Sequence, residues 1–143
     1  MKKTPLIETS TCLNKKVAIV YSSWHPDYVD KIREQLKNNL QEIEIDEIKV
    51  PGSNEVPWVA SKIARDYDGI ICVGILIKGD TLHFENISSA CSIGIMQAQI
   101  MTGVPMLNVI LSCYDFDQLE ERITGDKSTL NYITDSLREM MKY

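Results

Sequence analysis

The run GIICVGILI at residues 69–77 decides the fold class of this 143-residue chain. All nine residues are apolar or glycine, so the segment has no polar face to turn toward solvent. A strand of this kind is typical of the interior of a parallel sheet, which helices cover on both faces. The sequence therefore predicts an α/β fold with this strand near the centre of its sheet.

The segments around this strand alternate between strand and helix patterns. Further strands are predicted at residues 17–22, 43–50 and 106–112, and helices at residues 27–40, 55–67, 85–101 and most of 115–143. This order predicts a three-layer α/β/α sandwich around a four-stranded parallel sheet with right-handed crossovers, the flavodoxin-like arrangement. Residues 1–15 are expected to form an N-terminal arm, and residues 16–143 the folded domain.

Composition and charge limit the classes of partner. A hydrophobic content of 44% allows one domain to bury a core, and a formal net charge of -5 argues against nucleic acid or an anionic membrane as the main partner. The apolar runs are too short to span a bilayer, and the N-terminus lacks the apolar core of a secretory signal. We therefore expect a cytoplasmic protein that acts on small molecules.

The cysteines show no pattern of a metal site. Cys12, Cys72, Cys91 and Cys113 are scattered, with no CxxC pair and no Cys/His ligand spacing. Reduced thiols in the cytoplasm are the default interpretation, and no metal site is predicted.

Ligands of open α/β sheets bind beyond the carboxyl ends of the strands. That rule selects the loops at residues 22–26, 50–55, 76–83 and 112–115. Trp24 offers a flat face for stacking a heteroaromatic ring, although it could equally pack on its own helix. Glu55, at a helix start, is most simply a favourable first-turn carboxylate.

The loop KGDTLHF at residues 78–84 contains the most residues that could bind or react with a ligand. Gly79 allows close approach of a ligand, Thr81 precedes a helix start that can hold phosphate, and His83 can move protons near neutral pH. A lone histidine is more often structural than catalytic. Arg122, taken in isolation, is a solvated residue or part of a surface ion pair. The residues alone predict only a candidate small-molecule pocket.

Two segments, in the right order, resemble a known family. VPGSNEVP at residues 50–57 and GILIKGDTLHF at residues 74–84 are similar to two segments of the lumazine synthases, and TGVP at residues 102–105 follows at the expected distance. The resemblance runs from about residue 17 to residue 143. It implies a transferase of riboflavin biosynthesis that condenses 5-amino-6-(D-ribitylamino)uracil with 3,4-dihydroxy-2-butanone 4-phosphate.

The resemblance also implies roles for individual residues. His83 would be the general acid/base, and no cofactor is implied. The other implied roles are stacking on the pyrimidine by Trp24, binding of the ribityl chain and ring by Ser53, Asn54 and Glu55, lining of the same pocket by Ile75, Leu76 and Ile77, and phosphate binding by Asp80, Thr81 and Arg122. Asn108 stands where most members have a substrate-site phenylalanine from the neighbouring subunit. The family implies a homo-oligomer built on pentamers, with sites between subunits.

The chain departs from the family pattern at several positions. Asn54 replaces an aromatic residue, Val109 replaces a glycine, and the loop after Arg122 is short. His25 after Trp24, together with polar Asn108, is similar to the divergent second class of bacterial lumazine synthases. Two alternatives stay open at this point: a flavin- or lumazine-binding descendant without turnover, and an archaeal-type riboflavin synthase.

Overall fold

The central layer is a four-stranded parallel sheet. In the computed structural model, which describes residues 14–125 and 128–143, the strands lie in the order β2-β1-β3-β4. Their bounds are β1 (Lys16–Ser22), β2 (Glu44–Val50), β3 (Gly69–Ile77) and β4 (Met106–Cys113). The apolar run at residues 69–77 is therefore an interior strand between β1 and β4, as predicted. Most of the expected N-terminal arm, including Cys12, lies outside the described residues.

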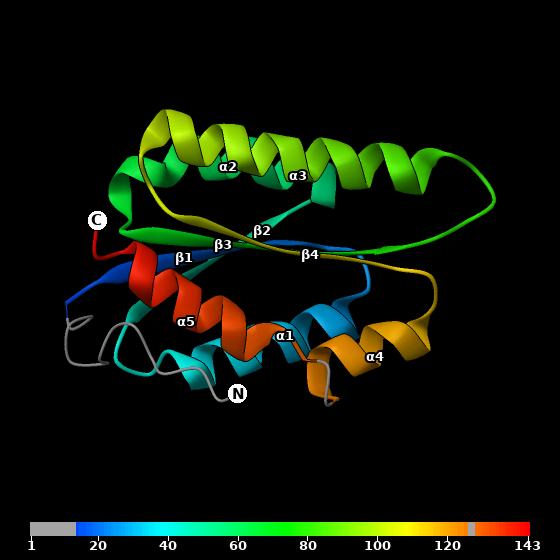
Figure 1. Ribbon diagram of the computed structural model, residues 1–143, viewed down its shortest axis with the longest axis horizontal. Coiled ribbons are helices and arrows are strands. Elements are labelled where there is room, and N and C mark those ends of the chain that lie inside the picture. Colours follow the sequence, from blue (N-terminus) through cyan, green and yellow to red (C-terminus); the bar gives the residue numbers. More distant parts are fainter. Residues whose placement is uncertain (1–13, 126–127) are drawn as a thin grey trace.

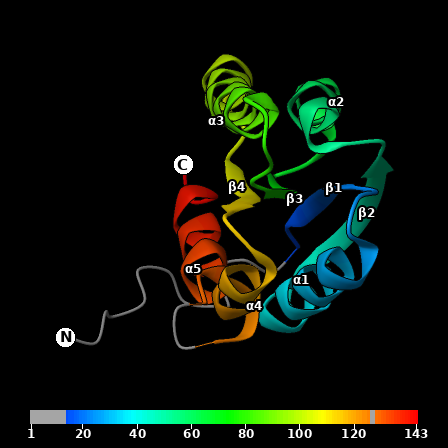
Figure 2. The same ribbon diagram turned by 90° about the vertical axis from the view of Figure 1, so that its right-hand side faces the viewer.

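Helices cover both faces of the sheet (Figures 1 and 2). One layer holds α1 (Pro26–Asn39), α4 (Phe116–Thr124) and α5 (Leu130–Met140), and the other holds α2 (Val56–Ile63) and α3 (His83–Thr102). This confirms the predicted α/β/α sandwich. The described helices include none that is long and apolar enough to cross a membrane.

Each face of the sheet has its own buried core. Along β1, Val17 and Ile19 pack toward α1, α4 and α5, whereas Ala18 and Val20 pack toward α2 and α3. The same alternation runs along β3, so apolar residues are needed at every position of these two strands. This requirement produces the continuous apolar runs that the sequence shows.

Several element boundaries differ from the sequence prediction. The helix predicted at residues 85–101 begins at His83, because the Thr81 hydroxyl accepts a hydrogen bond from the His83 backbone N–H at 3.3 Å. The helix predicted at residues 55–67 divides into α2 and the flanking 3₁₀ turns η2 (Ser53–Glu55) and η3 (Ala64–Asp66). Residues 115–143, predicted to be mostly helix, form the two helices α4 and α5. Asp115 caps the first of these by accepting from the Gln118 N–H at 2.8 Å.

Candidate active site

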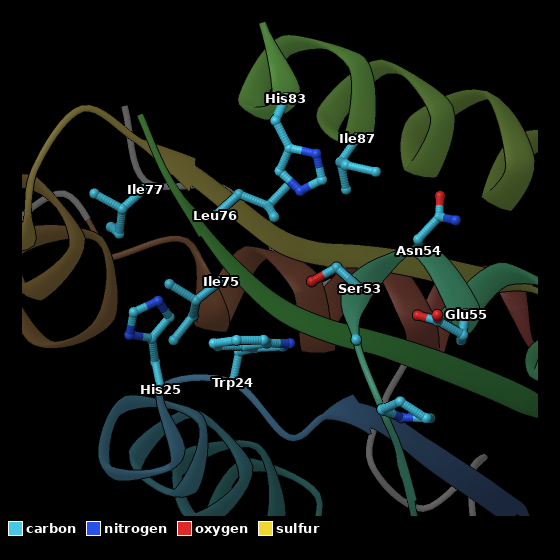
Figure 3. A pocket seen from close by; sticks show the side chains of 12 residues that line it. Trp24, His25, Ser53, Asn54, Glu55, Ile75, Leu76, Ile77, His83 and Ile87 are labelled. Carbon is cyan, nitrogen blue, oxygen red and sulfur yellow. The ribbon is translucent and has the colours of Figure 1, made fainter. Parts of the chain in front are cut away.

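A cavity lies at the carboxyl ends of β1, β2 and β3. The chain goes from β1 outward to β2 and then returns to β3 on the other side of β1, so the strand order reverses between β1 and β3. Open α/β sheets bind ligands at such a reversal. The cavity has a volume of about 540 Å³ and opens to solvent. The residues of the predicted site that line it are Trp24, Ser53, Asn54, Glu55, Ile75, Leu76, Ile77 and His83 (Figure 3).

The loop after β1 presents two rings to this cavity. Trp24 is 66% exposed, which argues against the alternative that it packs on its own helix. The Ser23 hydroxyl fixes the loop by donating to the Pro51 carbonyl at 2.5 Å. His25 has φ 54° and ψ 56°, a left-handed conformation rare for residues other than glycine, and its ring meets Phe116 edge-on at 5.4 Å between centroids. His25 lies in the loop at residues 22–26 that the strand-end rule selected, but it was not among the predicted site residues.

The turn between β2 and α2 forms a second wall. Ser53 is buried, and it packs so closely on β3 that a Cβ at Gly74 would lie 2.3 Å from the Ser53 Oγ. The Cys91 thiol of α3 donates to the Ser53 carbonyl at 3.2 Å. Burial, with a smaller contribution from Glu55, raises the pKa of Cys91 to about 11, so the thiol keeps the proton it donates. The hydrogen bond from Cys91 therefore holds the turn against α3.

Asn54 and Glu55, by contrast, are exposed on the cavity side of this turn. Glu55 is the N-cap residue of α2, yet its side chain makes no capping hydrogen bond. Its carboxylate forms no hydrogen bond or ion pair with the residues that the structure describes, so it is open to a ligand. The start of a helix still favours the negative charge of Glu55. The predicted role as a favourable first-turn carboxylate and a role in ligand binding are therefore compatible.

The third wall comes from α3. His83 and Ile87 project toward the cavity from the side opposite Trp24 (Figure 3). Ile87 follows His83 at the helical spacing of four residues, so the two share one face of α3. Ile87 was missing from the predicted site because His83 was expected in a loop; an earlier helix start would have identified it.

The remaining predicted site residues lie elsewhere. Asp80 and Thr81 are exposed on the loop before α3 and do not line the cavity. Arg122 lines a second cavity of about 450 Å³ beside the end of β4, together with Cys113 and Thr129. Within residues 14–125 and 128–143 the half-buried Arg122 side chain forms no ion pair, contrary to the surface-pair interpretation.

Asn108 is also remote from the first cavity. It lies in the middle of β4, an edge strand, and its Oδ1 accepts from the Ile110 N–H at 2.9 Å. Its amide nitrogen is 3.4 Å from the Ser92 Oγ of α3. Asn108 thereby accepts from one backbone N–H of this edge strand, and it does not line the first cavity.

Within the described part of the chain, no group of three or more histidine, cysteine, aspartate or glutamate side chains has the arrangement of a metal site. What the cavity offers is an aromatic face, a polar turn with a free carboxylate, and a histidine on the opposite side. These side chains suit a ligand with a flat polar ring and hydroxyl groups, and the histidine is the protein group able to transfer protons.

Comparison with known proteins agrees with this chemistry. The model of the 6,7-dimethyl-8-ribityllumazine synthase family matches residues 14–142. The chain belongs to this family. A protein of Xanthomonas oryzae pv. oryzae (strain PXO99A) named 6,7-dimethyl-8-ribityllumazine synthase is 36% identical over 117 residues, which cover 77% of this chain and 76% of that protein. A Streptomyces avermitilis protein of the same name is 34% identical over 125 residues, covering 85% and 78% of the two chains.

Membership confirms the resemblance that two short segments indicated. The chain is thus a transferase of riboflavin biosynthesis. The match favours this activity over both alternatives, the binding-only descendant and the archaeal-type riboflavin synthase. It spans both cavities, so the Arg122 region belongs to the same family domain as the Trp24 region.

Proposed function

We propose that this chain condenses 5-amino-6-(D-ribitylamino)uracil with 3,4-dihydroxy-2-butanone 4-phosphate to give 6,7-dimethyl-8-ribityllumazine and phosphate. The observation that carries the proposal is the cavity at the reversal of strand order, with Trp24 and His83 on opposite sides. Membership of the family supplies the identity of the substrates.

The uracil would stack on the exposed face of Trp24. Ser53, Asn54 and Glu55 would bind its polar edge and the ribityl chain, with the apolar end of β3 beneath them. An immobile Ser53 turn favours this role, because a preorganised site loses little entropy when the ligand binds. The packing of Ser53 on Gly74 and its support by Cys91 provide that preorganisation.

His83 would act as the general acid/base. The amine of the uracil attacks the ketone to form an imine with loss of water, phosphate leaves, the carbon chain reorients, and the ring closes with loss of a second water. These steps need protons to be moved and two reactive partners to be held together. The solvent-accessible imidazole of His83 suits proton transfer. The other walls of the cavity suit holding the two substrates together.

The sugar phosphate would bind at the loop before α3. A Cβ added at Gly79 would meet no atom within 4 Å, so the loop backbone is open to a ligand. Backbone N–H groups at the start of α3 and the Thr81 hydroxyl offer donors to an anion. Asp80 would contribute through its backbone, because its own charge repels phosphate.

We further propose that the site is completed by a neighbouring copy in an assembly built on pentamers. Arg122 and Asn108, which the family pattern assigns to the site, lie away from the pocket of their own subunit. An exposed apolar face on α3, formed by Ile93, Met96, Ile100 and Met101, offers a surface that such an assembly would cover. Arg122 of the neighbour would then form the bidentate phosphate contact that lysine cannot make. We place the protein in the cytoplasm, where the free thiols of Cys72, Cys91 and Cys113 stay reduced.

The direct test is synthesis of product by purified protein. Both substrates are mixed with the enzyme, and formation of the lumazine is followed by its absorbance and fluorescence against controls that omit each substrate. Product formed only when both substrates and protein are present supports the proposal. Tight lumazine binding without enzyme-dependent synthesis would instead support the binding-only alternative.

A further inference from the structure

An ion pair joins the start of the loop that precedes α3 to the first turn of that helix. Lys78 follows the last residue of β3, and its backbone N–H continues the sheet by donating to the Cys113 carbonyl at 2.9 Å. Its ammonium group turns back and pairs with the Oε1 of Glu85, seven residues along the chain. The same ammonium lies 5.6 Å from the centroid of the Phe84 ring. The Lys78 ammonium therefore contacts both the Glu85 carboxylate and the Phe84 ring.

Glu85 places a negative charge at the start of α3. The Lys78 hydrogen bond, as the largest influence, holds the pKa of the Glu85 carboxyl below its usual value, so the group is ionised at neutral pH. Its second oxygen, Oε2, is shielded from solvent and has no hydrogen-bond partner among the described residues. The carboxylate charge is shared by both oxygens, and it is stabilised first by the Lys78 ammonium and then by the Glu85 backbone N–H.

That charge lies beside the proposed phosphate loop. Asp80 adds a further carboxylate to the loop, and Leu82, the N-cap residue of α3, has no side chain that can cap the helix. Two anions near a site for a dianionic substrate would weaken binding by repulsion. The ammonium of Lys78 is the basic group that pairs with Glu85 in the first turn of this helix.

We propose that Lys78 is a positioning residue that neutralises Glu85 and so lets the loop at residues 79–82 accept the phosphate of the sugar substrate. The inference rests on the proposed function. In this proposal Lys78 acts through Glu85, with which its ammonium is paired, and not as a phosphate ligand. The effect of removing Lys78 should therefore depend on whether Glu85 is present.

A double-mutant cycle separates these roles. Lys78→Met leaves Glu85 uncompensated, and we expect KM for the sugar phosphate to rise about tenfold, since neighbouring charges at a half-exposed site interact through partly screened fields. KM for the uracil should stay unchanged. Lys78→Arg, which can keep the pair, should behave as wild type. Lys78→Met combined with Glu85→Gln should return KM for the sugar phosphate close to the wild-type value.

The control is Lys142→Met, which removes the same charge from a Lys142–Glu139 pair at the end of the chain. It should leave both KM values unchanged. An unchanged KM in Lys78→Met would overturn the inference. A double variant as impaired as Lys78→Met would also overturn it, because Lys78 would then contact the phosphate directly.

Calorimetric titration with inorganic phosphate tests the inference without turnover. Lys78→Met should weaken phosphate binding by about the same factor, and the double variant should recover it. Equal affinity in wild type and Lys78→Met would contradict the inference. If wild type binds phosphate in this pattern but makes no lumazine, the proposed function fails while the role of Lys78 in phosphate binding stands.

Discussion

The predicted site residues differ in how firmly the fold holds them. Ser53 is buried and fixed by Gly74 and Cys91, whereas His83 and Glu55 are exposed and free of side-chain partners in the described structure. Fixed groups suit substrate orientation, and free groups suit proton transfer or ligand contact. The residue types could be identified from sequence, but this division could not, because it depends on contacts between β3, α3 and the turn after β2.

Replacing His83 by alanine should slow the reaction without abolishing it. General acid/base help is worth about 10²–10⁴-fold in typical enzymes, but this condensation joins two reactive partners, so we expect a loss of roughly tenfold to a hundredfold. The measurement is the rate of lumazine formation across a range of pH. Circular dichroism checks that the variant is folded. An unchanged rate in folded protein would remove His83 from the mechanism.

Arg122→Ala should mainly raise KM for the sugar phosphate. A hydrogen bond to a charged group contributes about 1.5–3 kcal/mol, which corresponds to a rise of roughly tenfold to a hundredfold. Arg122→Lys should recover only part of the loss, since lysine keeps the charge but not the bidentate geometry. Arg65→Ala, at an exposed position on η3, is the control. Normal phosphate use with a lowered unfolding temperature would mean that Arg122 is structural.

At the scale of elements, the sequence predicted type and order better than boundaries. The strand at residues 69–77 was predictable because burial on two faces demands an unbroken apolar run. The start of α3 was not, because it depends on the Thr81 hydroxyl and the backbone of His83 rather than on apolar spacing. That two-residue difference moves His83 from a loop to a helix and brings Ile87 into the cavity wall. Small boundary errors therefore matter most at the site.

Gly74 and Gly79 form a matched pair for testing how β3 supports the site. A Cβ at Gly74 would lie 2.3 Å from the Ser53 Oγ and 3.5 Å from the Ile110 Cγ1, so Gly74→Ala should lower the free energy of unfolding by about 1–3 kcal/mol and raise KM for the uracil. At Gly79 no atom lies within 4 Å, and Gly79→Ala should change stability by less than about 0.5 kcal/mol. Urea denaturation supplies the comparison. Equal stability of the two variants would mean that Ser53 adapts without cost.

At the scale of the whole molecule, the chain holds two cavities with different linings. The cavity near Trp24 lacks a lysine or arginine in its wall, and the cavity near Arg122 lacks a histidine and a carboxylate. Both statements concern the residues that the structure describes. The family resemblance already implied sites between subunits, but the patterns of the residues alone could not show that Trp24 and Arg122 line different cavities. Assembly would bring complementary halves together.

We expect light scattering to give a mass that is a multiple of five 16.2 kDa subunits. Ile100 is 73% exposed on the apolar face of α3, so Ile100→Asp should place a charge in the interface, reduce the mass and reduce activity together. Asn38→Asp adds the same charge on α1 and should change neither. A monomer with full activity would refute the assembly.

Counting lumazine and inorganic phosphate in the same reaction tests the proposed condensation at its products. Purified wild-type protein is given both substrates, and the two products are measured over time by lumazine fluorescence and a phosphate assay. We expect them to appear together in equal amounts, faster than in the protein-free control, with neither released enzymatically when the uracil is omitted. Folded, assembled protein that binds lumazine but releases no phosphate and forms no product above the control would contradict the proposed function.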